Sequence, residues 1–125
     1  MPDKLTDFRQ LDVWQKAHRL VLNTYELTKK FPKDERQELV SRMREYAGNV
    51  PIQIAQGFMR RNPKEKSVAY KGTLSSLEAL KYCLILSEDL DYVKDVSEIL
   101  EDSQEVGRML TGLVKSARNN IKKGY

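Results

Sequence analysis

Apolar residues recur every three or four positions along most of the chain, and polar residues fill the positions between them. This spacing places the apolar side chains on one face of an α-helix. It predicts four helices, at about residues 13–30, 35–59, 63–90 and 96–118, and no segment alternates strictly enough to be a strand. Because only a few residues connect one helix to the next, successive helices should be antiparallel neighbours. We therefore predict an all-α, up-down-up-down four-helix bundle that forms a single domain.

Each predicted helix is preceded by a residue that can accept hydrogen bonds from the free N–H groups of a helix start. Asp12 has this role before the first helix, and Asp34 has it before the second. Asn62 precedes the third helix, with Pro63 at the first helical position, where no N–H is needed. Asp95 opens the fourth helix in the same way.

Pro51 lies inside the apolar stripe of the second helix. Its ring donates no hydrogen bond and clashes with the carbonyl four residues earlier, at Ala47. The apolar spacing continues in phase across Pro51, so we expect a second helix that is kinked at Pro51 rather than broken. Gly48 should tolerate the bend, and Gly57 should loosen the last turn.

Composition favours one folded, soluble domain. Of the 125 residues, 40% are hydrophobic and 32% are charged, which argues against disorder. No apolar run approaches the length of a membrane span and no signal-peptide pattern is present, so we expect a cytoplasmic protein without a membrane partner. The formal net charge of +4 mildly favours an anionic partner.

The inventory of reactive side chains favours a protein that is not an enzyme. The only histidine, His18, is interpreted as an ordinary surface residue, because Gln15 stands where a di-iron bundle requires glutamate. The only cysteine, Cys83, lies in an apolar stretch typical of an unreactive core thiol. The sequence has no phosphate-binding glycine loop and no nucleophile-elbow motif. We therefore expect no catalytic residue, no metal site and no cofactor.

The third predicted helix is apolar around nearly its whole circumference between Ala79 and Leu86, where only Lys81 is charged. A bundle helix in a monomer should keep one polar, solvated face. We therefore expect this helix to contact a second copy of the chain as well as its sister helices. The candidate interface residues are Leu80, Tyr82, Leu84, Ile85 and Leu86. The alternative is a monomer in which a segment such as Leu5–Leu11 covers the extra apolar side.

Charged residues are distributed unevenly along the predicted bundle. The turn between the second and third helices should share one end with both termini, and this end is rich in lysine and arginine. The opposite end, from Glu88 to Glu105, is rich in carboxylates. Copies assembled in parallel around a ring axis would combine their basic ends into a surface that attracts phosphates without reading base sequence. The candidate contacts are Arg60, Arg61, Lys64, Lys66, Arg118, Lys122 and Lys123, with Arg42 and Arg44 as secondary candidates. The alternative is that both clusters are solvated ends without a partner.

Several short motifs resemble those of a known family. They are Phe8-x-x-Leu11-x-Val13-Trp14-Gln15-Lys16-Ala17, Phe31-Pro32-Lys33, Val50-Pro51-x-x-Ile54-Ala55-x-Gly57, Arg60-Arg61 and Val106-Gly107-Arg108-Met109-Leu110-x-Gly112-Leu113. Together they are similar to the bacterial four-helix-bundle family of 23S ribosomal RNA intervening-sequence proteins. The resemblance implies a homopentameric ring. It also implies similarity to the accessory protein of diversity-generating retroelements, a basic pentamer that binds nucleic acid and its reverse transcriptase.

The chain departs from the family pattern at four positions. Gln53 and Gln56 stand where the family commonly has asparagine and glutamate, and Ala79 and Lys81 replace glutamates of its third helix. The neutral Gln56 removes an anion that could have paired with an arginine.

These features predict a non-enzymatic homo-oligomer that presents a basic surface to RNA or DNA, as an accessory factor to a nucleic-acid enzyme. The subunit number of five comes from the family resemblance alone. The alternative function is a protein–protein interaction scaffold with no nucleic-acid role, in which the charged ends dock partner proteins.

Overall fold

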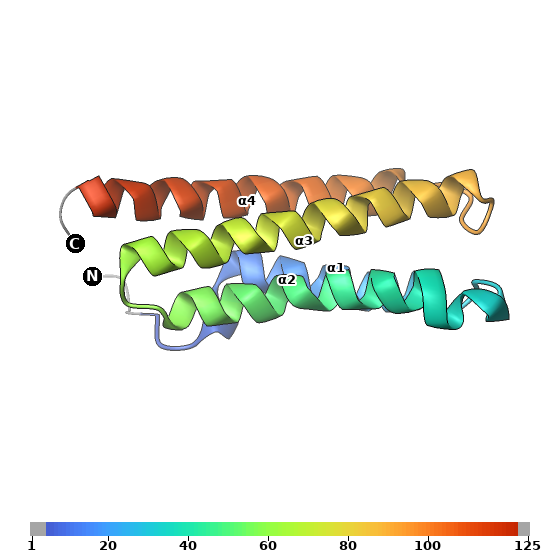
Figure 1. Ribbon diagram of the computed structural model, residues 1–125, viewed down its shortest axis with the longest axis horizontal. Coiled ribbons are helices and arrows are strands. Elements are labelled where there is room, and N and C mark those ends of the chain that lie inside the picture. Colours follow the sequence, from blue (N-terminus) through green and yellow to red (C-terminus); the bar gives the residue numbers. More distant parts are fainter. Residues whose placement is uncertain (1–4, 123–125) are drawn as a thin grey trace.

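The computed structural model describes residues 5–122 of the chain. Within these residues it contains four long α-helices and no strand, which confirms the predicted fold class. The helices are α1 (Asp12–Thr28), α2 (Ser41–Met59), α3 (Pro63–Asp89) and α4 (Ser97–Lys122). They run alternately in opposite directions along the long axis of the molecule, as an up-down-up-down bundle (Figure 1).

The predicted apolar stripes meet in one core. α1 packs against α2 and α4, and α3 packs against the same two helices, so the bundle is closed. The largest fully buried apolar side chains are Leu20, Met43, Val50, Ile54, Leu77, Leu80, Leu84, Val106 and Leu110. Polar core positions are also satisfied, because the hydroxyls of Thr24, Ser87 and Ser103 donate to the carbonyl one turn earlier at 2.7–2.8 Å.

Two of the predicted helix starts are confirmed. The side-chain oxygen of Asn62 accepts hydrogen bonds from the backbone N–H groups of Lys64 and Glu65, at 2.8 and 3.4 Å. Asp95 accepts a hydrogen bond from the backbone N–H of Ser97 at 2.9 Å. α4 continues to Lys122, four residues beyond the predicted end at 118.

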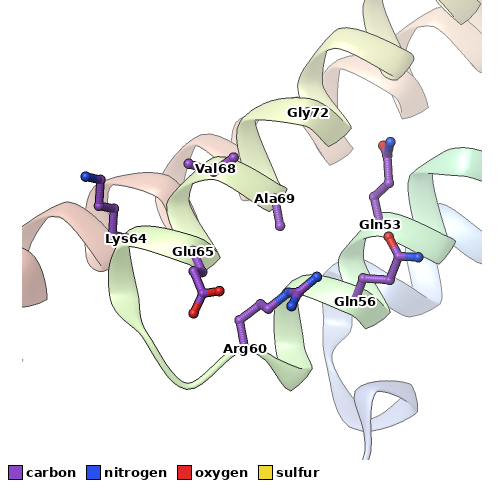
Figure 2. A pocket seen from close by; sticks show the side chains of 8 residues that line it. All are labelled: Gln53, Gln56, Arg60, Lys64, Glu65, Val68, Ala69 and Gly72. Carbon is purple, nitrogen blue, oxygen red and sulfur yellow. The ribbon is translucent and has the colours of Figure 1, made fainter.

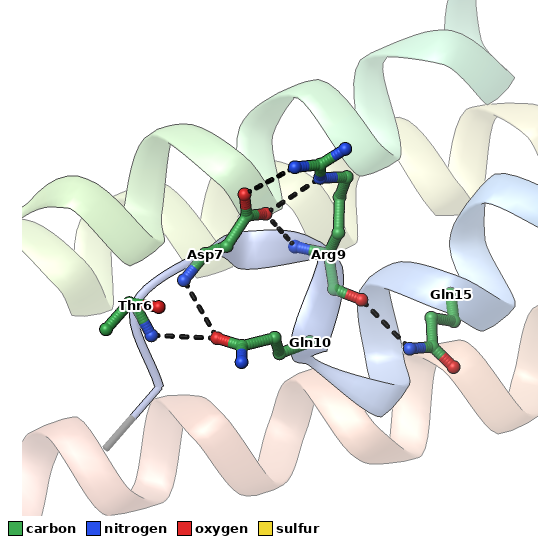
Figure 3. A network of polar contacts seen from close by, with 5 residues as sticks. All are labelled: Thr6, Asp7, Arg9, Gln10 and Gln15. Atoms are coloured by element: carbon green, nitrogen blue, oxygen red, sulfur yellow. Dashed lines mark hydrogen bonds and ion pairs between the residues drawn. The ribbon is translucent and has the colours of Figure 1, made fainter. Parts of the chain in front are cut away.

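The predicted cap at Asp12 is wrong, because Asp12 is already the first residue of α1. The preceding segment forms the short 3-10 turn η1 (Phe8–Gln10), and Asp7 and Gln10 make the capping box there (Figure 3). Gln10 Oε1 accepts hydrogen bonds from the backbone N–H groups ahead of the turn, and the Asp7 carboxylate pairs with Arg9 at 2.8 Å. The hydrogen bonds from Arg9 lower the pKa of Asp7 to about 2.

The predicted cap at Asp34 is also wrong. After Pro32 the chain enters a 3-10 turn, η2 (Lys33–Glu35), and then a π-helical turn, η3 (Arg36–Val40), before α2 begins. Asp34 therefore lies inside the first helical turn rather than ahead of it. Helical backbone still begins close to the predicted position of residue 35.

α2 continues through Pro51 without a break, as predicted, and the kink itself stays a prediction. The loosening of the last turn by Gly57 also stays a prediction, but this glycine has a packing role that the sequence did not reveal. A Cβ atom placed at Gly57 would lie 2.6 Å from Cε1 of Tyr70, whose side chain on α3 is buried. Contacts between carbon atoms are favourable only at about 3.5–4.0 Å. Only glycine therefore allows α2 to approach α3 this closely.

A Schellman motif ends α3 at the opposite end of the bundle. The N–H groups of Asp91 and Tyr92 donate to the carbonyls of Glu88 and Ser87, both at 2.9 Å. Asp91 adopts the left-handed conformation that this motif requires, with φ of 63°. Tyr92 then donates a hydrogen bond of 2.7 Å to Glu35, which ties this turn to η2.

Candidate nucleic-acid interface

Three helix ends bring most of the predicted basic residues to one end of the bundle. The turn from α2 to α3 and the end of α4 lie at the same end in Figure 1, as the sequence predicted. The exposed cationic side chains here are Arg60, Arg61, Lys64, Lys115, Arg118 and Lys122. None of them is within 4.0 Å of a carboxylate in the part of the chain that the structure describes. Lys123, which was predicted to join them, lies outside the described residues.

Lys66 has a structural role at this end. Its ammonium group donates hydrogen bonds to the carbonyl oxygens of Gly57 and Phe58, at 3.0 and 2.9 Å. These carbonyls belong to the last turn of α2, and the carbonyl of Gly57 also accepts a hydrogen bond of 3.2 Å from the backbone N–H of Arg60. Burial lowers the pKa of Lys66. We therefore correct its predicted role: Lys66 fixes the α2–α3 turn rather than offering its full charge to a phosphate.

Arg42 and Arg44 do not belong to this surface. They lie near the start of α2, and a helix rise of about 1.5 Å per residue places them roughly 25 Å from Arg60. Arg42 is 3.8 Å from Glu38. The guanidinium of Arg44 donates to Thr28 Oγ1 at 3.0 Å and lies over the ring of Tyr25, so it joins α2 to the end of α1.

The opposite end of the bundle carries the predicted excess of carboxylates. The α3–α4 turn carries the expected carboxylates, and one of them, Glu88, accepts a hydrogen bond from the backbone N–H of Val96 at 3.2 Å. The α1–α2 turn lies at the same end and brings in both Lys29, Lys30, Lys33 and Arg36 and the carboxylates of Asp34, Glu35 and Glu38. The sequence prediction considered only the α3–α4 turn. Because the charges of the α1–α2 turn nearly cancel, this end keeps its excess of carboxylates.

A groove between α2 and α3 opens beside the basic residues (Figure 2). It has a volume of about 470 Å³, and the residues that line it are Gln53, Gln56, Arg60, Lys64, Glu65, Val68, Ala69 and Gly72. In Figure 2, Arg60 extends from the end of α2 toward Gln56, and the side chain of Ala69 points from α3 into the space. Lys64 lies at the rim and points away from the groove.

Sequence reasoning named Arg60 and Lys64 but missed this groove. Its signal was present in the small residues Ala69 and Gly72 on the α3 side. The space between two helices also depends on how closely they approach each other. That distance could not be read from either helix alone.

The predicted oligomer interface divides into two sets. Leu80 and Leu84 are fully buried in the core of the single chain, so we correct the prediction that they contact another copy. Tyr82 and Ile85 are 63% and 46% exposed, and Leu86 is partly buried. Residues three and four positions apart are neighbours on a helix, so these three form one apolar patch. The segment around η1 packs against α1 and α2, and it leaves Tyr82 and Ile85 uncovered.

The two reactive residues singled out in the sequence, Cys83 and His18, differ in burial. Cys83 is buried, and this burial raises the pKa of its thiol. His18 is exposed, and its ring stacks on Trp14 with 5.1 Å between centroids. Residues 5–122 contain no group of three or more His, Cys, Asp or Glu side chains that could hold a metal ion.

No helix formed by residues 5–122 is long and apolar enough to span a membrane.

The fold defines a small all-α protein, a four-helix bundle. A family model described as 23S rRNA-intervening sequence protein matches residues 9–112. Because this match covers most of the chain, the protein belongs to that family, which confirms the resemblance seen in the sequence motifs. No curated protein matches the chain.

Proposed function

We propose that this protein is a non-enzymatic homo-oligomer that binds RNA or DNA without sequence preference through its basic end. It would act as an accessory factor to a nucleic-acid enzyme. The main support is the group of exposed cations that three helix ends bring together without a carboxylate partner among the described residues. The description of the family is consistent with an RNA-related role.

The expected contacts are Arg60, Arg61, Lys64, Arg118 and Lys122, which are all exposed. A protein that neutralises phosphates releases condensed counterions, so its affinity falls as salt rises. Five phosphate contacts to a single strand would reduce the affinity about 100-fold between roughly 50 and 200 mM salt. Contacts to phosphates carry no sequence information directly, which supports binding without sequence preference.

Self-association would increase the charge presented to one strand. The exposed apolar patch of Tyr82, Ile85 and Leu86 supports a contact with a second copy, because an exposed apolar cluster on a bundle is stabilised by being covered. A parallel ring, with five copies as the family resemblance implies, would place the basic ends side by side. The local positive field would then exceed that of one chain.

Charge reversal at the basic end tests the proposed binding. The double variant Arg60→Glu/Arg61→Glu should lose retention of a generic RNA in low salt. A matched control, Lys30→Glu/Lys33→Glu, makes the same change in net charge at the other end of the bundle, and it should retain RNA. Equal loss in both variants would mean that only net charge matters. Unchanged binding by Arg60→Glu/Arg61→Glu would exclude these arginines as the contacts, and a wild type that retains no RNA in low salt would favour the alternative scaffold function.

Sedimentation at micromolar concentration tests the proposed self-association. We expect an assembly much larger than the 14.5 kDa monomer. Ile85→Glu should dissociate it, whereas Leu22→Glu, at a residue of α1 that is 55% exposed, should leave it intact. A monomeric wild-type protein would exclude the ring.

A further inference from the structure

We propose that the groove between α2 and α3 binds one unpaired nucleotide of a single-stranded nucleic acid. Its base would lie in the groove, with its phosphate on Arg60 and the next phosphate near Lys64 at the rim. This inference rests on the proposed function, and it adds a preference for single strands over duplexes.

The groove has the size and wall chemistry that a nucleobase needs. Its volume of about 470 Å³ falls within the range of about 300–1,000 Å³ typical of small-molecule sites. The α3 side includes Val68, Ala69 and Gly72, which present small apolar surfaces beyond the charged Lys64 and Glu65 at the start of the helix. A Cβ atom at Gly72 would meet no atom within 4 Å, so the groove is open at this position. A flat base can be buried against such a wall.

The α2 side supplies hydrogen-bonding groups that suit any base. Amide side chains carry both donors and an acceptor, and so do the edges of nucleobases. Gln56 is exposed toward the groove, and Gln53 accepts a hydrogen bond of 3.1 Å from Ser76, which leaves its two amide N–H donors for a ligand. From the α3 side, Glu65 adds an acceptor for an exocyclic amino group or a ribose hydroxyl.

The charges around the groove favour a phosphate at the end where Arg60 lies. Arg60 points toward Gln56 and has no carboxylate within 4.0 Å among the described residues, although Glu65 lines the same groove. Gln56 is neutral, so Arg60 keeps a guanidinium that can bind a phosphate with two hydrogen bonds. A duplex keeps its bases stacked and paired, so only an unpaired nucleotide can place a base beside this arginine.

A groove-filling substitution tests the inference. Gly72→Leu adds a side chain where space is open, and it replaces a helical glycine with a better helix former, so the protein should fold. Gly112→Leu is the matched control: this glycine of α4 is also exposed, and a Cβ there also meets nothing within 4 Å. The probes are a fluorescein-labelled single-stranded RNA and a duplex of the same length and sequence, followed by fluorescence anisotropy at low salt.

We expect Gly72→Leu to weaken single-strand binding about tenfold, within the range measured for the loss of one stacked base, and to leave duplex binding unchanged. Gly112→Leu should change neither single-strand binding nor duplex binding. A second variant, Gln56→Glu, adds a carboxylate facing Arg60 and should also weaken single-strand binding selectively.

Three results would overturn the inference. If Gly72→Leu changes the affinity for both probes equally, or changes neither, no base binds in the groove. The proposed function would still stand in that case if the affinity of the wild type falls steeply with salt. Failure of the wild type to bind either probe at low salt removes both proposals. A change in sedimentation for Gly72→Leu but not for Gly112→Leu would show that a second copy occupies the groove instead.

Discussion

Replacing Gly57 with alanine tests the close contact that holds the α2–α3 turn in place. The new Cβ would lie 2.6, 3.0 and 3.2 Å from three ring carbons of Tyr70. Tyr70 is only 4% exposed, so its ring cannot swing into solvent to make room. Either the ring or the backbone of α2 must therefore move.

The size of the effect follows from two opposing contributions. To restore a normal carbon–carbon contact, the ring must move by about 1 Å, and overpacking of this kind typically costs about 1–3 kcal/mol. Alanine favours a helix over glycine by up to about 1 kcal/mol. We therefore expect Gly57→Ala to lower the free energy of unfolding by roughly 1–2 kcal/mol. Gly48→Ala, in the same helix but with nothing within 4 Å of its Cβ, should raise it by about 0.5–1 kcal/mol.

Urea unfolding followed by far-UV circular dichroism measures both changes. In a Tyr70→Leu background the ring is absent, so Gly57→Ala should lose its penalty and become neutral or stabilising. If Gly57→Ala stabilised the wild-type protein as much as Gly48→Ala does, the close approach of the two helices would not constrain this position, and our reasoning would be refuted.

Three further substitutions test other contacts. Lys66→Met should lower the free energy of unfolding by about 1–2 kcal/mol in urea titrations, because methionine cannot donate to the last carbonyls of α2, whereas the exposed Lys71→Met should have little effect. Asp91→Gly should raise the melting temperature, because glycine adopts a φ of 63° without strain, and an unchanged or lower value would contradict this. The hydrogen bond to Glu35 raises the pKa of Tyr92, so the folded protein keeps a proton that the unfolded chain loses above pH 10.0. The contribution of this hydrogen bond to stability is present below pH 10.0 and is lost as pH rises through the raised pKa. In urea titrations at a series of pH values, the free energy of unfolding of Tyr92→Phe should therefore fall less steeply above pH 10.0 than that of the wild type. Equal slopes for the two proteins would argue against this role of Tyr92.

Helical periodicity was enough to predict the fold, because each helix buries a stripe that its own sequence specifies. The starts at Asn62 and Asp95 were predictable for the same reason, since each cap uses a hydrogen bond to a residue two positions away. The start at Asp12 was not. There, Asp7 and Gln10 form a competing cap one turn earlier, and the two patterns are equally plausible on sequence alone.

Contacts between helices explain the errors at the site. Lys66 and Arg44 resemble free surface cations in the sequence, but each bonds to backbone or hydroxyl oxygens 8 to 16 residues away. The apolar run of α3 showed that more than one face of this helix is apolar. It did not show which of its residues are buried within the bundle itself. Leu80 and Leu84 face the core, and only Tyr82 and Ile85 stay well exposed. Such distinctions depend on how the helices are rotated about their axes.

The contacts that escaped sequence reasoning also have a functional consequence. Arg60 and Arg61 follow directly on the turn of α2 whose carbonyls Lys66 holds, and Gly57 seats that turn against Tyr70. A ligand that binds cations on an ordered turn loses less conformational entropy than one that must order them. Lys66→Met should therefore weaken RNA binding more than Lys71→Met, although both remove one positive charge. Equal weakening would mean that charge alone, and not the ordered turn, determines the affinity.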